Sequence, residues 1–132
     1  MKRKFAIAAI CLLWGTAFAQ QPARPRPAGT ARIDLQRHDL SIAGWESLQV
    51  LVSFEPGSSF PRHSHPGEEI IYVTKGTLDY EVAGKWVTVK AGGVLFIPNG
   101  VVHAARNSGK QPAAELATYV LEKGKPLVTF AE

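Results

Sequence analysis

The chain has 132 residues, of which 45% are hydrophobic and 20% are charged, and a formal net charge of +4. This length suits one domain with one core. Three of the positive charges, Lys2, Arg3 and Lys4, lie in a predicted signal peptide, so the mature chain would carry about +1 (4 − 3). A charge this small, without basic side chains interleaved with aromatic ones, excludes a nucleic-acid-binding protein.

The N-terminus has the parts of a secretory signal peptide. Residues 1–4 are positively charged, residues 5–18 are mostly apolar, and Ala17-Phe18-Ala19 is a small-x-small cleavage pattern. An uncleaved membrane anchor is the alternative, but the apolar run is short for a bilayer. We predict a signal peptide at residues 1–19, a mature chain that begins near Gln20, and a periplasmic or secreted protein without membrane attachment.

The segment after the cleavage site is rich in proline and glycine. This composition predicts a flexible mature N-terminus at residues 20–32, followed by a single domain at residues 33–132. The one cysteine, Cys11, would be removed with the signal peptide, which leaves neither disulfides nor thiolate metal ligands. His38 lies apart from the other histidines, and we interpret it as a surface residue.

From Leu48 onward, short apolar runs alternate with glycine and proline. Residues 48, 50, 52 and 54 are apolar and share one face, and Ala83-Gly84-Lys85 predicts a tight turn within a hairpin. No segment has helical periodicity over three turns. An all-β sandwich or barrel is therefore expected, with strands at residues 48–54, 69–74, 78–82, 86–90, 94–97, 101–107, 115–122 and 127–130.

A possible metal site lies in the segment between Gly57 and Gly76. His63 and His65 are two residues apart, so on an extended backbone both imidazoles project to the same side. Glu69 opens the next strand and shares a face with Ile71 and Val73. Imidazole and carboxylate donors suit Zn, Fe, Mn, Ni or Cu.

A fourth ligand is expected farther along the chain. His103 follows the Pro98-Asn99-Gly100 turn, and if it faces inward with Val101 and Ala105 it would meet the first group across a barrel. Buried imidazoles and carboxylates need partners, and a metal ion is the simplest one.

These two clusters resemble the two sequence motifs of the cupin superfamily. The first motif is matched by Gly57, His63, His65, Glu69 and Gly76, and the second by Gly92, Pro98, Gly100, His103 and Asn107. The resemblance implies a double-stranded β-helix, or jelly-roll barrel, that holds one divalent transition metal through His63, His65, Glu69 and His103. It also implies a homodimer, and a local structural role for Asn107.

The resemblance leaves the activity open, since many unrelated activities occur on this fold. The intact set of three histidines and one glutamate is similar to that of quercetin dioxygenase, which implies an oxygenase acting on a small organic substrate. In similar dioxygenases the motif glutamate also accepts the substrate's proton, which makes Glu69 the candidate catalytic residue. The alternatives are a non-redox isomerase, lyase or epimerase, and a non-catalytic protein that binds a metal or a small ligand.

Six aromatic side chains are expected mainly to pack in the core or on the sheets, with lining a pocket as the alternative: Phe60, Tyr72, Tyr80, Trp86, Phe96 and Tyr119. Trp45 and Phe60 flank strand ends, where the mouth of a barrel would be. Arg62 and Arg106 lie beside the ligand positions and could steer an anionic substrate, but strand alternation predicts that both point away from the ligand face.

Overall fold

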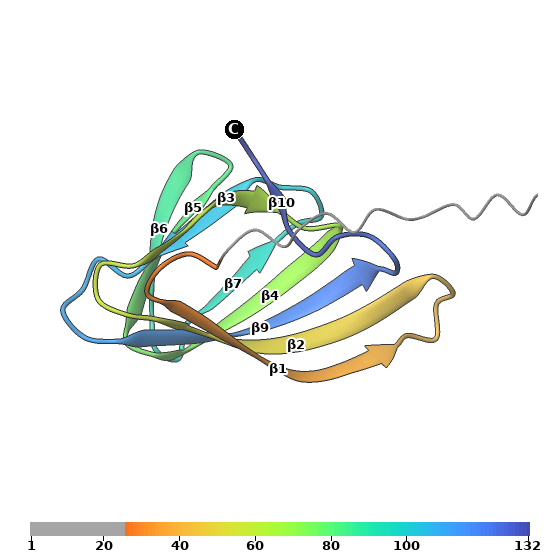
Figure 1. The fold of residues 1–132 in the computed structure, drawn as a ribbon, viewed down its shortest axis with the longest axis horizontal. Helices are drawn as coiled ribbons and strands as arrows, with labels where there is room; N and C mark the ends of the chain where they lie inside the picture. Colours follow the sequence, from red (N-terminus) through yellow and green to blue (C-terminus); the bar gives the residue numbers. More distant parts are fainter. Residues whose placement is uncertain (1–25) are drawn as a thin grey trace, which may run out of the picture.

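The structure is a computed structural model that describes residues 26–132, so the predicted signal peptide at residues 1–19 lies outside the described part. These residues form ten strands in two five-stranded sheets (Figure 1). The strands are β1 (Thr30–Asp39), β2 (Trp45–Phe54), β3 (Ser59–Ser64), β4 (Gly67–Lys75), β5 (Thr77–Val82), β6 (Lys85–Lys90), β7 (Val94–Ile97), β8 (His103–Arg106), β9 (Ala113–Glu122) and β10 (Thr129–Phe130).

Both sheets are antiparallel and mix early and late strands. One sheet has the order β1-β2-β9-β4-β7 and the other the order β10-β3-β8-β5-β6. Most strands that are consecutive in the chain, such as β3 and β4 or β7 and β8, lie in different sheets, whereas β1 and β2, and β5 and β6, are paired neighbours. This arrangement confirms the predicted all-β jelly roll. Within residues 26–132 no helix is long and apolar enough to cross a membrane.

The first strand differs from the expectation. β1 begins at Thr30, inside the segment predicted to be flexible, and it pairs with β2 along its whole length. Most β1 side chains are exposed, because β1 is an edge strand with one neighbour. Its sequence therefore lacks the regular alternation of apolar and polar residues by which the other strands were predicted.

The core lies between the two sheets and is built from inward-facing positions. β9 shows strict alternation, with every second residue from Ala113 to Leu121 buried. β2 follows the predicted pattern, with Leu48, Val50 and Phe54 each 1% exposed. The inward face of β9 carries two residues that are not aliphatic, Glu115 and Tyr119, and both lie beside the candidate site.

Candidate metal centre

A β-bulge on β3 sets the first part of the site. Phe60 pairs with Ala105 and His63 pairs with His103, so three steps on β3 match two steps on β8. The extra residue lets Phe60 and His63 face the interior together, although alternation would place them on opposite sides. Pro61 lies within this bulge, where its missing N–H breaks no ladder hydrogen bond.

The other three predicted ligands come from both sheets. His103 is the first residue of β8 and the direct cross-strand neighbour of His63, whereas His65 follows the end of β3. Glu69 lies on β4 in the opposite sheet and pairs with Tyr119 of β9. All four predicted ligands are buried, between 3% and 6% exposed.

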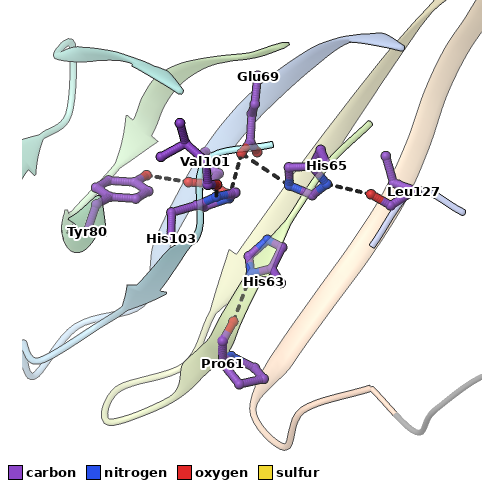
Figure 2. Close-up of polar contacts among 9 residues, drawn as sticks. Pro61, His63, His65, Glu69, Tyr80, Val101, His103 and Leu127 are labelled. Carbon is purple, nitrogen blue, oxygen red and sulfur yellow. Dashed lines mark hydrogen bonds and ion pairs between the residues drawn. The ribbon is translucent and has the colours of Figure 1, made fainter. Parts of the chain in front are cut away.

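The structure brings these side chains together. One ring nitrogen from each of His63, His65 and His103 lies within 4.8 Å of the others. Glu69 Oε2 is 3.0 Å from His103 Nε2 and 3.3 Å from His65 Nε2. Figure 2 shows the three rings and the carboxyl group of Glu69 pointing toward a common centre.

Backbone carbonyls fix the orientation of all three imidazoles. Figure 2 shows the three contacts. Nδ1 of His63 lies 2.7 Å from the Pro61 carbonyl oxygen, and Nδ1 of His65 lies 2.6 Å from that of Leu127. Nδ1 of His103 lies 3.0 Å from the Val101 carbonyl oxygen. A carbonyl oxygen only accepts, so each Nδ1 carries the proton and each Nε2 keeps its lone pair. This is the outer-shell arrangement by which proteins orient histidine ligands to a metal.

Two polar atoms at the centre lack a hydrogen-bond partner. Within the described part of the chain these buried atoms are His65 Nε2 and Glu69 Oε2, so their 3.3 Å contact is not a hydrogen bond. Orphaned polar atoms are costly in an interior. A cation shared by the four side chains would satisfy both atoms, and the residues present therefore fit a metal ion.

The protonation of the site agrees with this fit. Burial, together with the neighbouring His103 and His65, lowers the pKa of His63 to about 3, so the ring is neutral near pH 7 and able to ligate. Burial opposes ionisation of Glu69, and hydrogen bonds donated by ring N–H groups of His103 and His65 would hold the pKa of this carboxyl group well below its usual range. Because both Nε2 atoms carry no proton, a cation at the centre is what would keep Glu69 a carboxylate.

The site opens into a cavity of about 1250 Å³ between the sheets, here called the chamber. The four predicted ligands line it together with apolar side chains such as Phe54, Phe60 and Ile71. Phe60 packs edge-on against His63, with ring centroids 4.7 Å apart. A cavity with a few polar groups on apolar walls is typical of a small-molecule site.

Two further aromatic side chains were expected near the mouth of the barrel. Phe60 lines the chamber, whereas Trp45 is not among the described residues that line it. Arg62 and Arg106 point away from the site as predicted, since Arg62 lies 3.6 Å from Glu81 and Arg106 stacks over the Trp86 ring.

Asn107 is 1% exposed and has a structural role outside the cluster. Its Nδ2 donates to the carbonyl oxygens of Phe54 and Gln111, and its Oδ1 accepts from the Gly109 N–H. These contacts agree with the local role that the resemblance implied.

Three chamber residues were missed by the sequence analysis. Tyr80 and Tyr119 were expected mainly as packing aromatics, with lining a pocket as the alternative, and no role was predicted for Glu115. The Tyr80 hydroxyl donates a hydrogen bond to Glu115 Oε2, and the Tyr119 ring packs edge-on against His65 at 4.7 Å. The sequence could have predicted that Glu115 is buried, because the alternation of β9 places it on the same face as Ala113 and Ala117.

Residues 50–120, more than half of the chain, match the family described as Cupin domain. Germin-like protein subfamily 2 member 1 of Arabidopsis thaliana is 35% identical over 89 residues, which cover 61% of this chain and 41% of that protein. The oxalate-binding protein of Thermotoga maritima is 40% identical over 75 residues, covering 56% of this chain and 62% of that protein. The chain thus spans about two fifths of the germin-like relative's length.

Solved structures show the same fold. A Klebsiella pneumoniae protein with a double-stranded β-helix domain superposes with a TM-score of 0.68 at 25% identity, covering 83% of this chain and 90% of that one. A recombinant oxalate oxidase in complex with glycolate gives a TM-score of 0.63 at 28% identity, covering 80% of this chain and 56% of that one. With the family match over residues 50–120 and the double-stranded β-helix of the fold, the chain belongs to the cupin family.

Proposed function

We propose that this cupin binds one divalent transition metal through His63, His65, Glu69 and His103, and that it acts as an enzyme on a small organic substrate in the chamber. The observation that carries the proposal is the convergence of one carboxylate and three imidazoles that are held by backbone carbonyls. Two atoms of these side chains, His65 Nε2 and Glu69 Oε2, are buried without a hydrogen-bond partner. The donor set of nitrogen and oxygen suits Fe, Mn, Ni, Cu or Zn.

The chain's own residues would bind and orient the metal ion and the substrate. The carbonyls of Pro61, Leu127 and Val101 hold the imidazoles in the tautomer that ligates, and apolar side chains exclude water from the rest of the chamber. When bound, a metal of this class would polarise a substrate oxygen, and a redox-active ion would also supply chemistry with dioxygen. Glu69 is also the candidate acceptor of the substrate's proton, at the carboxylate oxygen that does not ligate the ion.

The reaction type divides into two proposals and one alternative. The preferred proposal is an oxygenase similar to quercetin dioxygenase, supported by the set of three histidines and one glutamate. The second is a non-redox isomerase, lyase or epimerase, supported by an apolar chamber that would protect a reactive substrate from water. The alternative is a non-catalytic binding protein. The name of the Thermotoga maritima relative, an oxalate-binding protein, supports this alternative.

Turnover by separately metal-loaded preparations tests these proposals. Mature protein loaded with Fe, Mn, Ni, Cu or Zn would be assayed for oxygen uptake with flavonols and enediols, and anaerobically with polyols and hydroxy acids. Oxygen uptake by a redox-active form supports the oxygenase, and anaerobic turnover by the Zn form supports the non-redox enzyme. If neither occurs and a small molecule co-purifies unchanged, the protein is a binding protein.

The matched control uses the histidine outside the site. His65→Ala removes a predicted ligand, so metal content and activity should both be lost. His38→Ala removes an exposed histidine of β1, and both should be retained. Equal metal content in the two variants would contradict the assignment of His65.

We also propose export with cleavage after residue 19, and assembly as a homodimer. Support for assembly comes from an apolar patch on the outer face of β4 and the edge strand β7, where Ile70 pairs with Phe96 and Tyr72 pairs with Val94. These four side chains are between 47% and 71% exposed. The mass of the mature chain tests cleavage, and light scattering of wild type and Phe96→Asp tests the dimer.

A further inference from the structure

The chamber contains a second buried carboxyl group, which the proposed metal site does not use. Glu115 is 5% exposed and lies on the inward face of β9 between Ala113 and Ala117. In a strand that only formed the core, this position would be apolar, because a buried carboxyl group is costly without strong partners. Glu115 therefore needs an explanation.

The contacts of Glu115 leave part of its hydrogen-bonding capacity unused. Tyr80, which is 1% exposed and comes from the opposite sheet, donates its hydroxyl proton to Oε2 (Figure 2 shows Tyr80). Among residues 26–132 no lysine, arginine or histidine forms an ion pair with Glu115, and Tyr80 is its hydrogen-bond partner. One neutral donor thus fixes the carboxyl group and leaves Oε1 available.

The chamber connects this carboxyl group with the metal centre. Glu115 and Tyr80 line the same cavity as the three histidines and Glu69. The cations that line it, Arg26 and Arg32, come from the N-terminal part of the described chain, and Arg32 is paired with Asp34 at 2.7 Å. A ligand bound at the metal centre would therefore extend along apolar walls toward a carboxyl group that has no cation of its own.

We propose that Glu115, fixed by Tyr80, is a specificity-determining residue that selects ligands with a hydroxyl group over ligands with a second carboxylate. A hydroxyl group both donates and accepts, so it matches Oε1 whether Glu115 is ionised or not. A carboxylate matches only the protonated acid, and otherwise two like charges meet in a desolvated site. The expected ligand is a hydroxy acid or polyol, with one oxygen group at the metal centre and a hydroxyl at Glu115.

This inference rests on the proposed metal site, and it is tested with two pairs of ligands matched in length. The pairs are 3-hydroxypropanoate with malonate and 4-hydroxybutanoate with succinate. Zn-loaded mature protein would be titrated with each by calorimetry at pH 9, where Glu115, with its pKa of about 8, is ionised. We expect the hydroxy acid of at least one pair to bind about tenfold more tightly than its dicarboxylate.

Glu115→Gln separates ligand selection from a structural role. Its amide keeps the size and the contact with Tyr80 but loses the negative charge, so the preference should shrink at least severalfold, chiefly through tighter dicarboxylate binding. Glu81→Gln changes a glutamate that lies beside Arg62 outside the chamber, and should leave the preference unchanged. Tyr80→Phe should weaken hydroxy-acid binding without reducing Zn content.

Two results would overturn the inference. One is tighter binding of the dicarboxylate in both pairs by wild-type protein. The other is a preference that Glu115→Gln leaves unchanged, while the variant retains wild-type Zn content and folding. Failure of wild-type protein to bind Zn would instead overturn the proposed metal site, so the two failures are distinguishable.

Discussion

At the residue scale, the orientation of the histidines is the main determinant of the site. Each Nδ1 contacts a carbonyl, and two of these carbonyls belong to residues two positions earlier in the chain, Pro61 for His63 and Val101 for His103. The third comes from Leu127, far along the sequence. Local geometry thus orients two rings, and the C-terminal segment orients the third.

The buried Glu115 predicts a pH dependence of stability for the metal-free protein. Burial first, and then the charge of Glu69, raise the pKa of Glu115 from 4.5 to about 8. The bound proton stabilises the folded state fully below the unfolded value of 4.5, and this contribution is lost as pH rises through about 8. Between these values the folded state holds one more proton, so the free energy of unfolding falls by up to about 1.4 kcal/mol per pH unit from this group.

Denaturant unfolding of wild type and Glu115→Gln between pH 4.5 and pH 8.5 measures this effect, because the variant lacks the titrating group. The stability of the wild type relative to the variant should decline as pH rises across this range. A difference between the two proteins that stays flat, or that increases with pH, would contradict the assignment.

At the element scale, the bulge on β3 and the loops around Asn107 determine which side chains reach the chamber. The backbone N–H of Asn107 donates to the Ser58 carbonyl, and the Gly57 N–H donates to the Asn107 carbonyl. With the side-chain bonds to Phe54 and Gln111, Asn107 joins the end of β2, the start of β3 and the loop between β8 and β9. It is therefore a structural residue of the second motif.

Asn107→Ala should lower the free energy of unfolding by about 2–4 kcal/mol, because three side-chain hydrogen bonds are lost at a buried position. Denaturant unfolding measures the change. Asn99→Ala, in the exposed turn between β7 and β8, is the control and should stay within about 0.5 kcal/mol of wild type. A loss for Asn107→Ala no larger than for the control would refute this role.

At the scale of the whole molecule, the sequence predicted the fold and the position of the candidate site because both depend on local patterns. The alternation of β2 and β4, the glycine and proline turns, and the spacing of the two histidine motifs are all visible in the chain. The hairpin turn is one case, since Ala83 and Gly84 both adopt positive φ, at 48° and 80°, as a tight two-residue turn requires.

What the sequence did not predict depends on contacts between distant residues. β1 is held by pairing with β2 rather than by its own pattern. The partner of Glu115 is Tyr80, 35 positions away and in the other sheet. The bulge that turns both Phe60 and His63 inward is a register shift, and a register shift exists only between paired strands.

The central claim is that three imidazoles and one carboxylate share one cation in the chamber, and X-ray absorption spectroscopy of the Zn-loaded mature protein tests it most directly. The account predicts a first shell of nitrogen and oxygen at about 2.0–2.1 Å, with scattering from three imidazoles that falls to two in His103→Ala. A wild-type spectrum with fewer than three imidazoles, or one that His103→Ala leaves unchanged, would contradict it.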